Sequence, residues 1–266
     1  MLEAPASVDK LRWVMSQLRD PNGGCPWDLK QDFASIVPYT LEEAYEVAEA
    51  IDQKDFSELE KELGDLLFQV IFYSQLGQEQ DLFSFDSVVA AICEKLIRRH
   101  PHVFGDTDLR SDAEIKANWE NEKAKERAEK ADTEQPPSIL ADIPNRLPAL
   151  SQAAKIQKRC AHVGFDWLAI EDVFEKVEEE VAEVKAELDT NEEKLAEELG
   201  DLMFAVVNLC RHAKQDPEQL LRKANKKFTR RFQGVEQRVA ESGKSIEQHD
   251  LQTLDNYWRQ VKQAEK

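Results

Sequence analysis

Residues 40–51 read TLEEAYEVAEAI, and residues 58–67 read ELEKELGDLL. Apolar residues recur in both stretches at the spacing of an amphipathic helix, so the pair predicts two helices. The connection between them is short, which makes the helices antiparallel neighbours. The stripes that should border a common core are Leu41, Ala44, Tyr45, Ala48 and Ile51, and Leu59, Leu63, Leu66, Leu67 and Val70.

Acidic residues accompany both stripes at one separation. Glu43 and Glu46 are three residues apart, as are Glu62 and Asp65, so each pair shares one face of its helix. Four carboxylates that converge at the edge of an apolar core repel one another, and a hard cation bound through oxygen, such as Mg²⁺, relieves that repulsion. One such run is also common on a solvated helix face, and for a single occurrence the solvated face is the favoured interpretation.

The pattern returns in the second half of the chain. Residues 179–183 read EEVAE and residues 197–201 read EELGD, 137 residues after the first acidic pair and 136 residues after the second. The corresponding acids are Glu180, Glu183, Glu198 and Asp201. The repetition indicates a tandem duplication of one helical unit, and it favours a cation site over a solvated face.

A change in composition separates the two copies. Residues 135–140 read QPPSIL and residues 143–148 read IPNRLP, and neither can continue as helix through its prolines. We therefore expect a helical domain over residues 1–130, a proline-rich linker over 131–150 and a second helical domain over 151–266. The predicted fold class is all-α, because Leu, Ala, Glu and Lys dominate while Gly and Pro are few.

The composition narrows the classes of function. The formal net charge of −18 over 266 residues argues against general nucleic-acid binding, which needs a basic surface. No apolar run is long enough for a membrane span, and the N-terminus lacks the pattern of a signal peptide. The four cysteines are scattered without a C-x-x-C motif, which is typical of a reducing compartment. We expect a cytoplasmic protein without membrane or nucleic-acid partners.

Basic and aromatic residues follow the acids of the second copy. Residues 227–231 read KFTRR, and Trp258 comes near the end of the chain. A nucleoside triphosphate site needs these residue types: carboxylates hold Mg²⁺, the cation holds phosphate oxygens, Lys and Arg balance the remaining charge, and Trp can stack on a base. A glutamate that is not fully engaged by metal can orient or deprotonate water. Taken alone, Lys227, Arg230 and Arg231 fit a solvated helix face.

The duplicated acidic motifs, the K-x-x-R-R run and the late tryptophan together resemble the MazG nucleoside triphosphate pyrophosphohydrolase family over essentially the whole chain. The resemblance implies tandem all-α helical bundles, homodimerisation, and hydrolysis between the α- and β-phosphates that needs Mg²⁺, with Mn²⁺ as a substitute. It implies a nucleoside monophosphate and pyrophosphate as products, from ribo- and deoxynucleotides of many bases.

The same resemblance assigns roles to individual residues. Catalytic and metal-binding roles fall on Glu180, Glu183, Glu198 and Asp201. The matching positions of the first copy are Glu43, Glu46, Glu62 and Asp65. Nucleotide contacts fall at or near Lys176, Glu179, Lys194, Glu197, Lys227, Arg230, Arg231 and Trp258. Two rival classes stay open: another metal-dependent phosphohydrolase, acting on a deoxynucleotide or a signalling nucleotide, and a non-enzymatic helical adaptor.

The two copies differ one helical turn before the third acid. The second copy has Lys194 four residues before Glu198, whereas the first has Glu58 four residues before Glu62. Residues four apart share a helix face, so lysine would attract a triphosphate and glutamate would repel it. The sequence therefore predicts that the second copy is the main active site and that the first supports dimerisation or structure.

Overall fold

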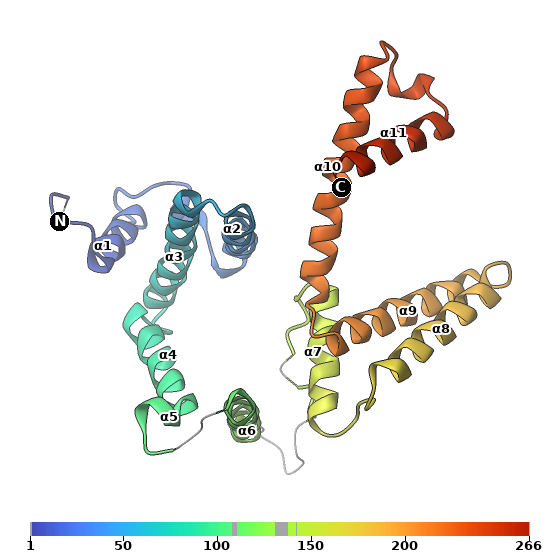
Figure 1. The fold of residues 1–266 in the computed structure, drawn as a ribbon. Helices are drawn as coiled ribbons and strands as arrows, with labels where there is room; N and C mark the ends of the chain where they lie inside the picture. The colour runs from blue at the N-terminus through green and yellow to red at the C-terminus, as the bar shows by residue number, and fades with distance from the viewer. Residues whose placement is uncertain (1, 108–110, 131–137, 142, 266) are drawn as a thin grey trace. The chain divides into compact units, whose positions relative to one another are not determined.

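The structure is a computed structural model that describes residues 2–107, 111–130, 138–141 and 143–265. These residues form helices and turns without a β-strand, which confirms the all-α prediction (Figure 1). The elements are α1 (Val8–Leu18), η1 (Asp28–Lys30), α2 (Phe33–Gln53), α3 (Phe56–Glu79), α4 (Phe85–Arg99), α5 (Pro101–Phe104), α6 (Asp112–Lys130), α7 (Ala149–His162), α8 (Ile170–Glu187), α9 (Glu192–His212), α10 (Pro217–Glu241), η2 (Ile246–Gln248) and α11 (Leu251–Ala264).

The chain divides into two compact units, residues 1–123 and 124–266, so the division falls within α6. Of the predicted linker over 131–150, residues 131–137 and 142 lie outside the described part of the chain. The linker residues that are described form turns up to α7, which begins at Ala149.

The first unit is built on the antiparallel hairpin of α2 and α3. Helix α2 begins seven residues before the predicted Thr40, because Asp32 and Ser35 form a capping box that starts the helix at Phe33. Lys54 ends α2 in the left-handed conformation with φ of 58°, and Asp55 then caps α3. The buried core beneath the hairpin consists of Met15, Ile36, Ile71, Phe72 and Leu76.

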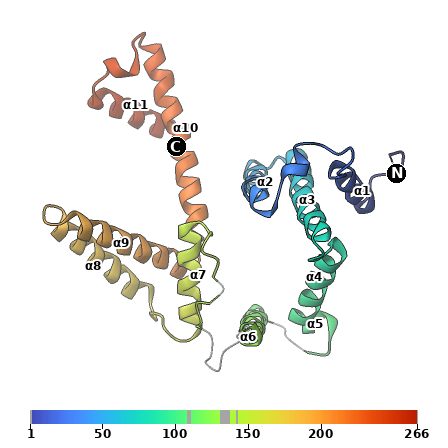
Figure 2. The same ribbon diagram turned by 180° about the vertical axis from the view of Figure 1, so that it is seen from behind.

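The second unit repeats the hairpin with α8 and α9, which Figure 2 shows from the opposite side. Helix α7 packs against α9, while α10 leads to α11. Asn191 caps α9 by accepting hydrogen bonds from two backbone N–H groups, and Asp216 caps α10 in the same way from Gln219. Helix α8, by contrast, begins after Ala169, which makes no side-chain capping hydrogen bond.

Apolar side chains on the hairpins are only partly covered. Leu41 and Leu63 of the predicted stripes are each 50% exposed, and Met203 on α9 is 58% exposed. The helical spacing of Val88, Val89, Ile92 and Leu96 on α4 predicts that these four residues face a core. That prediction is wrong within a single chain for Val89, Ile92 and Leu96, which are exposed, whereas Val88 is half-buried. One unit has too few helices to cover every apolar face that it presents. None of the described helices has the length and hydrophobicity needed to cross a membrane.

Candidate active site

Both hairpins bring acids of the duplicated motif together. In the second unit, carboxylate oxygens of Glu180, Glu183 and Glu198 lie within 4.8 Å of one another. In the first unit the same holds for Glu43, Glu62 and Asp65. In each hairpin one helix supplies two acids three residues apart and its antiparallel neighbour supplies one. Glu46 and Asp201 of the predicted sets lie outside these groups of three. We call these groups the second-unit cluster and the first-unit cluster.

Glu180 is the most buried acid of the second-unit cluster, at 5% exposure. Its Oε1 accepts an ion-pair contact of 2.9 Å from the Nζ of Lys176, which also lies 3.0 Å from Glu179. These hydrogen bonds hold the pKa of the Lys176 ammonium above its ordinary value. The other oxygen of Glu180, Oε2, is buried without a hydrogen-bond partner in the described part of the chain. A buried carboxylate oxygen of this kind needs a cation or a donor.

Repulsion within the second-unit cluster is visible in Glu198. Partial burial raises the pKa of its carboxyl, and the charges of Glu183, Asp201 and Glu180 raise it further. Asp201 thus belongs to the same electrostatic group, and Glu197 adds to the repulsion. The possible ligands are all carboxylate oxygens, they carry excess negative charge, and one of them is buried without a hydrogen-bond partner. Such a set of ligands fits a hard divalent cation such as Mg²⁺ or Mn²⁺.

The first-unit cluster has different neighbours. Burial raises the pKa of Glu43, as do the charges of Asp65 and Glu46, while the Nε2 of Gln69 donates to Glu43 at 3.4 Å and opposes that rise. Partial burial and the charge of Glu46 likewise raise the pKa of Glu62. These acids fit a cation too, but the side chain that donates to Glu43 is the neutral amide of Gln69 and not an ammonium group.

The Glu58–Lys194 contrast is weaker in the structure than in the sequence. Lys61 lies 2.6 Å from Glu58 and pairs with it, so the extra acid of the first unit is largely neutralised. Lys194 is exposed near the start of α9, where its backbone N–H is capped by Asn191. The stronger difference between the units is Lys176, whose position in the first unit, 137 residues earlier, is Tyr39.

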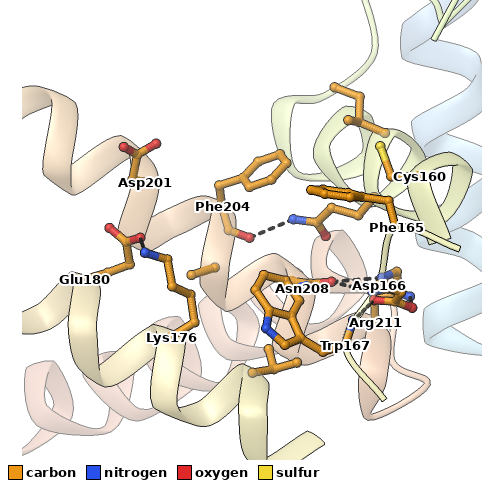
Figure 3. Close-up of a pocket in the computed structure, with 14 residues that line it drawn as sticks. Cys160, Phe165, Asp166, Trp167, Lys176, Glu180, Asp201, Phe204, Asn208 and Arg211 are labelled. Atoms are coloured by element: carbon orange, nitrogen blue, oxygen red, sulfur yellow. Dashed lines mark hydrogen bonds and ion pairs between the residues drawn. The ribbon is translucent and has the colours of Figure 1, made fainter. Parts of the chain in front are cut away.

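A pocket of about 170 Å³ adjoins the second-unit cluster. Lys176, Glu180 and Asp201 line one side, and the loop between α7 and α8 lines the other with Phe165 and Trp167 (Figure 3). Three further lining residues, Gln157, Phe204 and Asn208, are not among the residues that the sequence assigns to the site. In the sequence, the G-F-D-W run at residues 164–167 indicates an aromatic wall. A glutamine on an amphipathic helix does not indicate that its side chain lines a pocket.

A charged network fixes the aromatic loop against α9. The guanidinium of Arg211 donates to both carboxylate oxygens of Asp166, and its Nε donates to the Oδ1 of Asn208 at 2.9 Å. The hydrogen bonds from Arg211 hold the pKa of Asp166 below its ordinary value against the opposing effect of burial, and His212 adds to the lowering. The network positions Phe165 and Trp167 at the mouth of the pocket.

The predicted basic residues lie on a separate pair of helices. The guanidinium carbon of Arg231 lies 6.0 Å from the ring centroid of Trp258, and Arg230 and Arg231 both donate to Glu265, at 2.8 Å and 2.7 Å. Figure 1 shows the α10–α11 pair extending away from the α8–α9 hairpin. Within one chain these side chains, with the exposed Lys227, are therefore not brought to the acids, and their role in nucleotide binding stays a prediction.

Comparison with known proteins identifies the family. The model of the MazG nucleotide pyrophosphohydrolase domain matches residues 31–104 and again residues 169–236. The chain belongs to the MazG family. The two matches also confirm the tandem duplication, since each MazG domain contains one acidic hairpin.

Full-length relatives support this assignment. The nucleoside triphosphate pyrophosphohydrolase of Escherichia coli K12 is 52% identical over 97% of this chain and 98% of its own length. The nucleoside triphosphate pyrophosphohydrolase/pyrophosphatase MazG of Thermotoga maritima is 43% identical over 98% of both chains. A crystal structure of a MazG-related protein from the same organism is 27% identical, with a TM-score of 0.38, and covers 44% of this chain and 98% of that chain.

Proposed function

We propose that this protein hydrolyses nucleoside triphosphates to nucleoside monophosphates and pyrophosphate, with the second unit as its main active site. The observation that carries the proposal is the orphaned, buried Oε2 of Glu180 beside Lys176, at the edge of an open pocket. The names of the two full-length relatives state this activity for those proteins. Ribo- and deoxynucleotides with different bases are the proposed substrates.

The second-unit cluster supplies the groups that such a reaction needs. Glu180, Glu183, Glu198 and Asp201 would hold Mg²⁺, or Mn²⁺ in its place, and the cation would balance the charge of the phosphate oxygens. The Nζ of Lys176 lies beside Glu180 and adds positive charge next to these carboxylates. A carboxylate of the cluster that is not saturated by metal orients water and accepts its proton.

A homodimer is the proposed assembly. Phe174, Leu199 and Met203 on the α8–α9 hairpin are 51%, 44% and 58% exposed. Leu199 and Met203 are four residues apart and share one face of α9, and exposed apolar surface of this kind favours association with another chain. A second chain would also offer its α10–α11 pair to the acids, which the same chain's pair does not reach. A triphosphate would then replace Glu265 as the anion on Arg230 and Arg231.

A product assay tests the proposal. The protein with Mg²⁺ is given ATP, GTP, CTP, UTP, deoxynucleotides and damaged triphosphates, and pyrophosphate and orthophosphate are measured separately. Pyrophosphate with an equimolar monophosphate is expected. Orthophosphate as the direct product would indicate another class of phosphohydrolase. No turnover, together with no thermal stabilisation by Mg²⁺, would indicate a helical adaptor.

A further inference from the structure

Two arginine side chains of α10 share one carboxylate near the end of the chain. The Nε and Nη2 of Arg230 donate to the Oε1 of Glu265 at 3.0 Å and 2.8 Å. The Nε of Arg231 donates to the Oε2 of the same carboxylate at 2.7 Å. These hydrogen bonds from Arg231 and Arg230 hold the pKa of the Glu265 carboxyl below its ordinary value, so the group is an anion at neutral pH.

The arginine pair carries more positive charge than Glu265 balances. Two guanidinium groups meet a single negative charge, and the exposed Lys227 lies one turn before Arg231 on the same face of α10. A guanidinium group binds phosphate through the same planar fork that binds a carboxylate. A polyphosphate brings several negative charges where Glu265 brings one, so the charge of the pair suits a polyphosphate better than it suits this carboxylate.

The contact with Glu265 can exchange with a ligand from solution. The side chain of Arg230 is 67% exposed, and that of Glu265 is 25% exposed. Glu265 follows α11, which ends at Ala264, so its side chain can turn away without unwinding the helix. Ion pairs between exposed side chains contribute little to stability. A polyphosphate can therefore reach the arginines and compete with the carboxylate for them.

Other contacts hold α11 against α10. Gly234 lets the two helices approach closely, since a Cβ at this position would lie 2.9 Å from the Cγ1 of Val261. Trp258 of α11 packs on Phe228 of α10, with 5.1 Å between the ring centroids. This packing is apolar and does not involve Glu265. Removing the charge of Glu265 should thus leave the helix pair folded.

We propose that Glu265 is an internal competitor of the substrate, which occupies the arginine pair until a polyphosphate displaces it. The proposal rests on the proposed function for the role of Arg230 and Arg231 in nucleotide binding, and it adds what these arginines hold when no substrate is bound. The apparent dissociation constant of a ligand rises as the open fraction of its site falls. Glu265 thus weakens the binding of each polyphosphate that uses the pair, and its return to the arginines favours release of the product.

Binding of inorganic triphosphate tests the proposal without requiring turnover. Glu265→Gln keeps the size of the side chain but removes its charge, and circular dichroism verifies that the helices persist. Isothermal titration of the full chain, in buffer without Mg²⁺, should show the variant binding triphosphate roughly threefold to tenfold more tightly than the unaltered chain. Equal or weaker binding by the variant overturns the proposal, and so does the absence of binding by both proteins.

Further substitutions separate competition from a general change of charge. Asp255→Asn is the matched control: it removes one negative charge from α11, where Asp255 pairs with Arg259 at 2.7 Å, and it should leave the affinity for triphosphate nearly unchanged. In a chain that carries Arg230→Gln and Arg231→Gln, adding Glu265→Gln should give no gain, because the competitor no longer covers the binding groups. A gain that Asp255→Asn reproduces, or that persists without the arginines, overturns the proposal.

Steady-state kinetics are measured in parallel, so that the two proposals can fail separately. With Mg²⁺ and ATP, Glu265→Gln should lower KM. Tighter binding of triphosphate without release of pyrophosphate from ATP would leave the role of Glu265 standing and reject the proposed reaction. Release of pyrophosphate with the same triphosphate affinity in both proteins would reject the role of Glu265 and leave the reaction standing.

Discussion

The two units carry the same acids but surround them differently. Three positions on the hairpins show the change: Tyr39, Gln69 and Phe72 of the first unit correspond to Lys176, Ala205 and Asn208 of the second. Phe72 is 1% exposed in the core of its unit, whereas Asn208 lines the pocket and binds Arg211. Larger side chains thus occupy in the first unit the positions that border a pocket in the second. A copied ligand motif does not by itself make two equivalent sites.

The electrostatic surroundings point the same way. The ammonium group of Lys176 lies beside the second-unit cluster, 2.9 Å from Glu180. The first-unit cluster has the neutral amide of Gln69 against Glu43. A polyanionic substrate would therefore meet a site with one more positive charge in the second unit. The first unit can still hold a cation, but it offers a polyanionic substrate one positive charge fewer.

The largest expected difference is between two single variants, each of which removes the corresponding acid from one unit. Glu180→Gln should lower kcat by roughly 10²- to 10⁴-fold, the range for loss of an acid–base or charge-stabilising group. Glu43→Gln, the same change at the corresponding position, should leave most of the activity. Steady-state pyrophosphate release by both variants measures this. Equal losses would show that both units hydrolyse substrate, and the comparison would then fail.

Filling the second-unit pocket should have the next largest effect. Asn208→Phe introduces the side chain that the first unit has at this position, and it removes the acceptor that holds Arg211. We expect kcat/KM to fall roughly tenfold to a hundredfold, because the substrate loses space and the aromatic wall loses support. Circular dichroism verifies that the helices persist. An unchanged kcat/KM would show that the pocket is not used.

Cation binding should stabilise both units. Mg²⁺ at 100 times its Kd stabilises a folded state by about 2.7 kcal/mol, which should appear as a higher melting temperature. Glu198→Gln and Glu62→Gln should each reduce the rise, and the double variant should abolish it. Scanning calorimetry with and without Mg²⁺ checks this. A full response in the double variant would mean that the cation binds elsewhere.

The smallest expected effects concern the arginine–carboxylate pairs that brace each unit. Arg19, whose side chain is 7% exposed, pairs with Glu79 at 2.6 Å in the first unit, as Arg211 pairs with Asp166 in the second. Allowing for solvent screening, Glu79→Gln should cost about 2 kcal/mol of unfolding free energy and Asp166→Asn about 1 kcal/mol. The first cost is larger because Arg19 is left more deeply buried.

The pH dependence of these costs follows from the pKa values. Burial raises the pKa of Glu79, but hydrogen bonds from Arg19 and Gln75 outweigh it, and the pKa of Asp166 is also lowered. A lowered pKa gives stability that is present above the ordinary carboxyl pKa and lost as the pH falls through the folded value. Urea unfolding at pH 7 should show both costs, and at pH 3 the differences from the unaltered chain should shrink. Costs that are independent of pH would contradict the ion pairs.

The fold class, the duplication and the convergence of the acids can be predicted from the pattern of residues along the chain. Residues three apart share a helix face, and a short connection forces the next helix to run back alongside. Glu43 therefore meets Glu62 and Asp65 once the helices form, and in the second unit Glu198 meets Glu180 and Glu183. These conclusions depend on local geometry, which a sequence pattern contains. The start of α2 at Phe33 is local too, because it depends on the Asp32–Ser35 capping box.

The surroundings of the acids depend on how the helices pack against one another. The unpaired oxygen of Gln157, the partnership of Lys176 with Glu180 and the exposure of the α4 stripe each depend on which helix packs opposite. Lys227, Arg231 and Trp258 share a motif with the acids in the sequence, yet within one chain they lie on another helix pair. Burial and unmet hydrogen bonds are properties of two packed surfaces, and the pattern along one helix specifies only one of them.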